Sequence, residues 1–343
     1  MRKRLSMGII IFLVCVAGIA LGFSLHRNLR TKVERQCKAK FLKMVPMRYS
    51  SKCKKQGHVV RLDYETHDYL TGGNEKKVIK KYLQVYLPYD YSEDNQYNII
   101  YLMHGMGGDA QTWLGTDEDP SMGKNYLDHL IQDEKIPPVI VVTPSYYQGK
   151  EAYETDDYDS SLTKCFGKEL ENDVMPLVES KYSTYAQRPD KDGFESSREH
   201  RAFAGFSMGA VTTWYRMIDS MRYFKYYMPF AGSLYWGVEA LGSDDGEWDA
   251  SQLTKAIKEQ GYSAEDYYVY YAVGSLDYAR ENVDPSLESM LDFPKYFKFG
   301  HPDDKDVNIT FGVALYEYHT PSCRNRCLYN ALPIIMKKMQ AEE

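Results

Sequence analysis

The stretch Ala204-Gly205-Phe206-Ser207-Met208-Gly209-Ala210 decides the fold of this 343-residue chain. It follows the run His200-Arg201-Ala202-Phe203, which is typical of a strand, and precedes Val211–Met217, which can continue as a helix. A serine between two glycines at a strand-to-helix turn has the pattern of a nucleophile elbow, where a side chain on either glycine would clash with a neighbouring element. The pattern predicts that Ser207 is the attacking group of an acyl-transfer enzyme.

The segments around this turn alternate between strand and helix patterns from about Gly57 onward. Two alternating segments, Val59–Tyr64 and Tyr82–Pro88, predict an antiparallel edge. Apolar runs predict strands buried on both faces at Ile99–Met103, Val139–Pro144, Arg201–Gly205, Tyr227–Gly232, Tyr267–Val273 and Ile309–Leu315. Helices are predicted at Gly167–Lys181, Met208–Ser220, Ala250–Gln260 and Leu328–Lys338. The alternation predicts an α/β fold with a mostly parallel, doubly wound sheet flanked by helices.

A serine hydroxyl needs a histidine to take its proton, and in α/β-hydrolases the chain order is serine, acid, histidine. Only two histidines follow Ser207 in the sequence. His319 comes just after the last predicted strand, where this fold delivers its base, whereas His301 lies in a turn before that strand. We therefore expect His319 to be the base and keep His301 as the alternative.

The acid is expected in the loop after the preceding strand. Tyr267–Val273 runs into Gly274-Ser275-Leu276-Asp277, so Asp277 can reach the His319 loop. A helix-capping role is the ordinary alternative for an aspartate after a turn. The rival acids are Asp284, Glu281 and Glu317.

The oxyanion hole requires two backbone N–H groups that point at the developing negative charge. Met208, the residue after the nucleophile, is expected to supply one. Leu102-Met103-His104-Gly105-Met106-Gly107-Gly108 matches the glycine-rich oxyanion loop of this fold, with Met106 the first choice as donor and Gly105 next. No second ligand stands at metal-binding spacing from His104, so neither a metal nor a cofactor is expected.

The first 56 residues differ from the rest in charge. Arg2-Lys3-Arg4 and the apolar run Met7–Phe23 predict a signal peptide or membrane anchor over residues 1–23. Residues 24–56 hold eleven Lys or Arg and one acid, which predicts a basic linker or stalk able to associate with a membrane or cell wall. Residues 57–343, the predicted catalytic domain, carry 28 basic and 47 acidic residues, so a nucleic-acid partner is not expected.

Tyrosine is unusually abundant, at 31 residues. An aromatic ring with a polar tip suits contact with sugars or aromatic groups, although most of these tyrosines can equally fill strands. The turn-like segment Ser145–Leu162 follows a strand and is rich in tyrosine and acids. Tyr146, Tyr147, Tyr153 and Trp236 are expected to line the substrate cleft. The pairing of the six cysteines cannot be assigned from their spacing.

These motifs resemble the bacterial feruloyl esterases of carbohydrate esterase family 1, which also includes acetylxylan esterases and is similar to esterase D and the mycolyltransferases. The resemblance covers roughly residues 57–340 and is strongest at Tyr101–Gly105, Arg201–Gly209, Gly274–Asp277 and Tyr329–Pro333. It implies an α/β-hydrolase fold and a triad of Ser207, Asp277 and His319. The segment Glu317-Tyr318-His319-Thr320-Pro321 departs from the family's Gly-x-x-His-x-x-aromatic pattern, on the leaving-group side.

Together these observations predict an exported serine carboxylic-ester hydrolase that acts on acyl esters of carbohydrates, such as feruloyl or acetyl esters of xylan. It would be secreted or tethered to the outer face of the membrane. An acyltransferase that passes the acyl group to a sugar or lipid alcohol is the enzymatic alternative. A non-catalytic glycan-binding surface protein is the non-enzymatic one.

Overall fold

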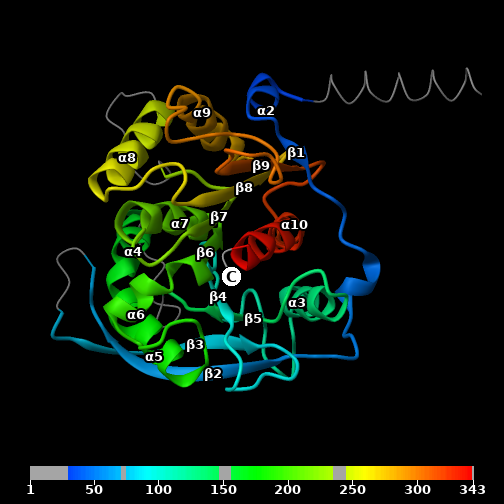
Figure 1. The fold of residues 1–343 in the computed structure, drawn as a ribbon, viewed down its shortest axis with the longest axis vertical. Coiled ribbons are helices and arrows are strands. Elements are labelled where there is room, and N and C mark those ends of the chain that lie inside the picture. The colour runs from blue at the N-terminus through cyan, green and yellow to red at the C-terminus, as the bar shows by residue number, and fades with distance from the viewer. Residues whose placement is uncertain (1–29, 71–74, 147–155, 235–244, 342–343) are drawn as a thin grey trace, which may run out of the picture.

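The computed structural model describes residues 30–70, 75–146, 156–234 and 245–341. One nine-stranded sheet with the order β1-β9-β8-β7-β6-β4-β5-β3-β2 forms its centre (Figure 1). The strands are β1 (Lys40–Phe41), β2 (His58–His67), β3 (Val78–Leu87), β4 (Asn98–Met103), β5 (Val139–Thr143), β6 (Arg201–Phe206), β7 (Tyr226–Phe230), β8 (Tyr268–Gly274) and β9 (Ile309–Ala314).

Strand β3 runs in the direction opposite to that of the other strands of this sheet. It pairs antiparallel with β2 and with β5, whereas the other neighbouring pairs are parallel. Strands β4 to β9 are buried along their whole length, because helices cover both faces of the sheet. The predicted antiparallel edge and the mostly parallel doubly wound sheet are confirmed.

Helices lie on both sides of the sheet. Figure 1 shows α3 and α10 on one face and α4, α7 and α8 on the other. The helices are α2 (Lys32–Gln36), α3 (Met122–Gln132), α4 (Asp156–Glu169), α5 (Met175–Lys181), α6 (Lys191–Ser196), α7 (Met208–Asp219), α8 (Asp245–Glu259), α9 (Arg280–Met290) and α10 (Pro321–Gln340), with a π-helical turn at Leu170–Val174 and 3-10 turns at Met47–Ser50 and Arg198–His200.

Helix α4 corrects one expectation. The turn-like prediction for Ser145–Leu162 is wrong from Asp156 onward, where α4 begins. Three acids of this segment, Asp156, Asp157 and Asp159, stand at the start of α4, where negative charge stabilises a helix. Helices α3 and α9 carried no clear signal in the sequence, and α10 begins seven residues earlier than predicted.

Residues 30–56, here called the N-terminal strap, differ from the solvated linker that their composition predicts. Strand β1 pairs parallel with β9, and Val33, Cys37 and Leu42 are buried in the main core. The strap, blue in Figure 1, contains α2 and β1 and then continues beside α3. Hydrogen bonds join Leu42 and Lys43 of the strap to α10. The basic side chains of α2, Lys32 and Arg35, are exposed, whereas Val33, Glu34 and Cys37 are buried. The average composition therefore concealed an amphipathic pattern.

A buried ion pair fixes the strap to helix α9. Glu34 accepts a hydrogen bond from Arg280 Nη1 at 2.7 Å, and Arg280 also contacts Asp284 at 2.8 Å. The Glu34 side chain is only 3% exposed. Among the described residues no helix is long and apolar enough to cross a bilayer, and the apolar run Met7–Phe23 lies outside them.

We expect Glu34→Gln to lower the free energy of unfolding by about 1.5–3 kcal/mol, because a buried charge-assisted hydrogen bond is lost while Arg280 stays buried. Urea denaturation measures this change. Glu65→Gln is the control, since Glu65 contacts Lys80 at 3.9 Å on the exposed surface and its loss should cost under about 0.5 kcal/mol. Equal small effects of both substitutions would contradict the role given to Glu34.

Candidate active site

The three predicted catalytic side chains follow three strands of the sheet. Ser207 comes directly after β6, Asp277 follows β8, and His319 follows β9. Strands β6 to β9 are parallel neighbours, so the loops after them meet at the carboxyl edge of the sheet. Ligands bind at this edge in open α/β sheets. The structure thus brings together residues that are 112 positions apart in the sequence.

Ser207 is held in a strained backbone conformation. Its φ is +60° and its ψ is −121°, an arrangement that costs a non-glycine residue about 1–3 kcal/mol. The backbone of Ser207 is fixed by a hydrogen bond from its N–H to the carbonyl oxygen of Phe230, at 2.8 Å. Helix α7 starts at the next residue. This strand, strained serine and helix form the nucleophile elbow that the sequence predicts.

The two glycines of the motif sit where no side chain fits. A Cβ at Gly205 would lie 2.3 Å from the carbonyl oxygen of Gly209, and a Cβ at Gly209 would lie 2.5 Å from that of Met103. Both neighbours are backbone atoms and cannot move aside as a flexible side chain could. Helix α7 can therefore start against the end of β4 only because these positions are glycine.

Asp277 and His319 form a hydrogen-bonded pair. His319 Nδ1 lies 2.8 Å from Asp277 Oδ1, and the Asp277 side chain is fully buried. A second hydrogen bond, from the Ala279 N–H at 2.9 Å, holds the same carboxylate oxygen. Since a carboxylate only accepts, Nδ1 carries the proton and Nε2 is left as the basic nitrogen when the imidazole is neutral.

Aromatic rings place the His319 imidazole beside the nucleophile. The ring of Phe206, the residue before Ser207, lies 4.6 Å from the imidazole by centroid distance. The ring of Tyr278 lies 4.5 Å from it. The acid–base pair therefore stands next to the elbow, as the proton relay of a serine enzyme requires.

The alternative candidates for the base and for the acid lie elsewhere in the structure. His301 precedes β9 and so stands at the opposite, amino edge of the parallel strands. Asp284 binds Arg280 on α9, and Glu281 is exposed on the same helix. Glu317 accepts a hydrogen bond from Ser322 at 3.0 Å and lies 3.7 Å from Arg326. The geometry favours His319 and Asp277.

The loop after β4 lies against Ser207. A Cβ built on Gly105 would be 3.2 Å from Ser207 Cβ and 3.8 Å from its Oγ, so this glycine borders the nucleophile directly. Met106 follows Gly105, and Met208 is the first residue of α7. Both predicted oxyanion donors therefore stand in segments that adjoin Ser207.

His104 holds this loop from inside. Its Nδ1 lies 2.7 Å from the Gly105 carbonyl oxygen, and its Nε2 lies 2.9 Å from Ser145 Oγ. A carbonyl can only accept, so Nδ1 donates to it and Nε2 accepts from the Ser145 hydroxyl. Burial, with a smaller contribution from the nearby Lys81 charge, lowers the pKa of His104 from 6.5 to about 4. His104 is therefore neutral near pH 7 and orients the loop.

Tyr146 supports the same loop instead of standing in an open cleft. It is only 5% exposed, its ring packs edge-on against His104 at 4.9 Å, and its hydroxyl bonds to Thr212. Its carbonyl oxygen accepts a hydrogen bond from the buried Lys81. No pattern in the sequence indicates this burial, because an aromatic residue in a polar loop is usually exposed. Tyr147, Tyr153 and Trp236 lie outside the described residues.

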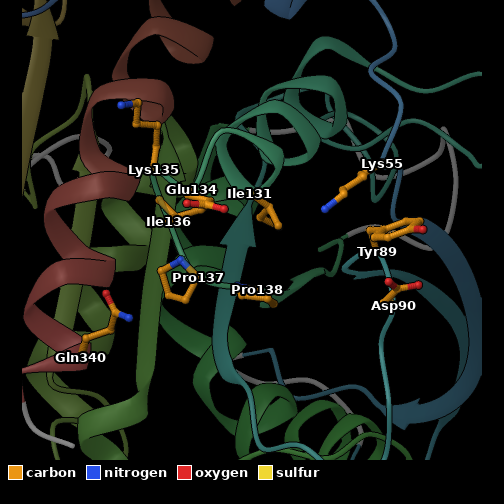
Figure 2. A pocket seen from close by; sticks show the side chains of 10 residues that line it. All are labelled: Lys55, Tyr89, Asp90, Ile131, Glu134, Lys135, Ile136, Pro137, Pro138 and Gln340. Atoms are coloured by element: carbon orange, nitrogen blue, oxygen red, sulfur yellow. The ribbon is translucent and has the colours of Figure 1, made fainter.

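A hollow of the surface lies at the opposite edge of the sheet, away from Ser207. It measures about 480 Å³ and is lined by Lys55, Tyr89, Asp90, Ile131, Glu134, Lys135, Ile136, Pro137, Pro138 and Gln340 (Figure 2). Pro137 and Pro138 stand just before β5, so the hollow faces the amino ends of the parallel strands. Its lining mixes charges of both signs and contains no nucleophile beside a base. Within the described ranges, no cluster of His, Cys, Asp or Glu could hold a metal.

A strained serine at the centre of a mostly parallel sheet, with a histidine–aspartate pair beyond the later strands, defines an α/β-hydrolase. Comparison with known proteins agrees. The chain belongs to the Esterase family, described as "Putative esterase", which it matches over residues 80–291. It is a serine carboxylic-ester hydrolase. The resemblance to feruloyl esterases of carbohydrate esterase family 1 is confirmed.

Two solved structures show the similarity in detail. A serine-to-alanine mutant of the feruloyl esterase module from Clostridium thermocellum, complexed with sinapinate, is 34% identical with a TM-score of 0.72 and covers 86% of this chain and 94% of that one. A structure titled FAE is 35% identical, with a TM-score of 0.73 and the same coverage. A ferulic acid esterase of the fungus Anaeromyces mucronatus shares the fold at 19% identity and a TM-score of 0.59.

The curated relatives are much longer proteins. Endo-1,4-beta-xylanase Y of Acetivibrio thermocellus is 35% identical over 288 residues, which are 84% of this chain and 24% of the relative. An endo-1,4-beta-xylanase/feruloyl esterase of Xylanibacter ruminicola is 26% identical over 200 residues, 53% of this chain and 25% of the relative. The chain thus spans about a quarter of the length of the curated relatives it matches.

We expect His104 to make the protein less stable in acid. Its folded pKa of about 4 lies below the unfolded value of 6.5, so the unfolded state binds more protons between these values. The stability present above pH 6.5 is therefore lost as the pH falls toward 4, by up to about 3 kcal/mol. His104→Gln, which can still donate to Gly105, removes this contribution.

Urea denaturation from pH 7.5 to 4 measures the effect. As the pH falls, the free energy of unfolding of wild type should decrease more than that of His104→Gln. The control is His58→Gln, because His58 is exposed at the surface. Parallel pH profiles for wild type and His104→Gln would show that His104 does not titrate as described.

Proposed function

We propose that this protein is an exported esterase that hydrolyses feruloyl or acetyl esters on xylan-type polysaccharide, with Ser207, His319 and Asp277 as its triad. The observation that carries the proposal is the buried hydrogen bond of 2.8 Å between Asp277 and His319. The imidazole of His319 packs on Phe206, the residue before the strained Ser207. This combination supplies a nucleophile, a base and the group that fixes the tautomer of the base.

In the first half of the reaction, Ser207 Oγ attacks the ester carbonyl carbon while His319 Nε2 takes the hydroxyl proton. Asp277 stabilises the imidazolium that forms. The Met208 and Met106 N–H groups hold the oxyanion of the tetrahedral intermediate. The intermediate collapses when the bond to the leaving alcohol breaks and His319 returns its proton to that alcohol oxygen.

In the second half, water attacks the acyl–Ser207 ester. His319 takes a proton from the water and gives it back to Ser207 Oγ as the carboxylic acid leaves. No cofactor is needed, because the proton moves between Ser207, His319 and the substrate alone. An added sugar alcohol would compete with water at this step, so the acyl products in its presence distinguish hydrolysis from transfer.

The substrate class rests on the relatives and on charge. The relatives named above carry feruloyl esterase modules or xylanase names. Xylan esters are neutral or weakly acidic, and the net charge of −19 over residues 57–343 disfavours strongly anionic polymers. Export rests on the basic and apolar pattern of residues 1–23.

We expect Ser207→Ala to lower kcat/KM for methyl ferulate and 4-nitrophenyl acetate by at least about 10⁴-fold, because the acyl-enzyme cannot form. The far-ultraviolet circular dichroism spectrum should not change. Ser180→Ala, on the surface of α5, is the control and should keep full activity. Activity of Ser207→Ala within tenfold of wild type would refute the proposed nucleophile.

A further inference from the structure

Exposed aromatic and apolar side chains gather around the candidate site. Within the described residues ten large apolar side chains are exposed, and five of them stand on the loops after β4, β8 and β9, which border the site. They are Met106, Leu276, Tyr278, Tyr316 and Tyr318. Single exposed apolar residues are normal on a protein surface, but a concentration of half of them at one edge indicates a binding surface.

The three tyrosines stand on the loops that carry the acid and the base. Tyr278 follows Asp277 and packs on the His319 ring at 4.5 Å, while 58% of its surface stays exposed. Tyr318 directly precedes His319 and is 60% exposed, and Tyr316 is 71% exposed. Their rings are therefore accessible to a molecule that sits beside His319.

The backbone that displays these tyrosines is firmly held. The Tyr316 N–H donates to Ser275 Oγ at 2.8 Å, and the Leu276 N–H donates to the Glu317 carbonyl oxygen at 3.0 Å, so the acid and base loops are joined. Tyr316 has a φ of +62°, which is unusual for a bulky residue and fixes its direction. A rigid aromatic surface loses little entropy when a ligand binds.

The reaction mechanism indicates which half of the ester contacts this surface. His319 must return its proton to the oxygen of the leaving alcohol, so the alcohol half of the ester lies on the His319 side of Ser207. The acyl half then extends away from the base loop. In the proposed substrates the alcohol half is a sugar, whose flat C–H face and hydroxyl groups match an apolar ring with a polar tip.

We propose that Tyr278, Tyr316 and Tyr318 form the binding surface for the saccharide half of the ester, on the leaving-group side of the site. This proposal rests on the proposed esterase function and extends it from the acyl group to the sugar. The surface sets which alcohols are accepted and leaves the chemistry at Ser207 unchanged.

The test compares two esters with the same acyl group, methyl ferulate and a feruloylated arabinoxylo-oligosaccharide. In the variant with both Tyr316→Ala and Tyr318→Ala, kcat/KM for the oligosaccharide should fall about 5- to 20-fold, mainly through KM, while that for methyl ferulate stays within twofold. Tyr318→Phe should keep most of the oligosaccharide activity, because the ring remains. Tyr89→Ala, exposed beside the hollow at the opposite edge, is the control.

Equal losses of kcat/KM on both esters would overturn the proposal, since they would indicate damage to the catalytic chemistry. An unchanged kcat/KM for the oligosaccharide would also overturn it. A measurement without turnover separates this proposal from the esterase function. Calorimetry with the unesterified oligosaccharide and the Ser207→Ala protein should show binding that the double tyrosine variant weakens at least fivefold. Absence of binding to Ser207→Ala would overturn the saccharide surface even if ester hydrolysis is established, and inactivity on every ester would overturn only the proposed function.

Discussion

The candidate site depends on one close backbone approach, between the first turn of α7 and the end of β4. At Gly209 the carbonyl oxygens of Met103 and His104 occupy the space that a side chain would need. This approach puts the loop after β4 beside the nucleophile, and it leaves so little room between β6 and α7 that Ser207 takes a positive φ. The strain costs about 1–3 kcal/mol, which the buried strands on both sides of the elbow can supply. The free energy of the core thus holds the nucleophile in place before any substrate arrives.

Much of this arrangement could be predicted because it is local in the sequence. The periodicity of each strand and the glycines at the elbow depend on neighbouring residues. The order of serine, acid and histidine follows the order of the strands in this fold, and the structure brings Asp277 and His319 to the expected edge. The roles of these residues stay predictions until they are tested. What could not be predicted depends on distant contacts. The burial of Tyr146 follows from packing on His104 and Thr212, and no pattern around position 146 reveals those partners.

Average composition was misleading in the N-terminal strap for a related reason. Ten basic residues in a short block predict a linker or stalk, but stability depends on which positions face the core. In the strap Val33, Cys37 and Leu42 face the core while Met44 and Met47 are exposed, and the single acid, Glu34, pairs with Arg280 at the start of α9. Arg326 on α10 extends the connection, since it donates to the Leu42 carbonyl oxygen in the strap and to that of Leu315 before the base loop. The strap is thereby joined to both segments that present the acid–base pair.

The pairing of β1 with β9 has a consequence for the order in which the chain can fold. Lys40 and Phe41 find their partners at Gly312 and Val313, about 270 positions later. A ribosome therefore completes nearly the whole chain before the first strand has a place to dock. Closing so long a loop is slow, and until it closes Cys37 and its apolar neighbours stay exposed to solvent. Strand β1 is the first strand of the sheet to be made and can pair only after β9, so the emerging chain must keep the strap from aggregating until β9 is made.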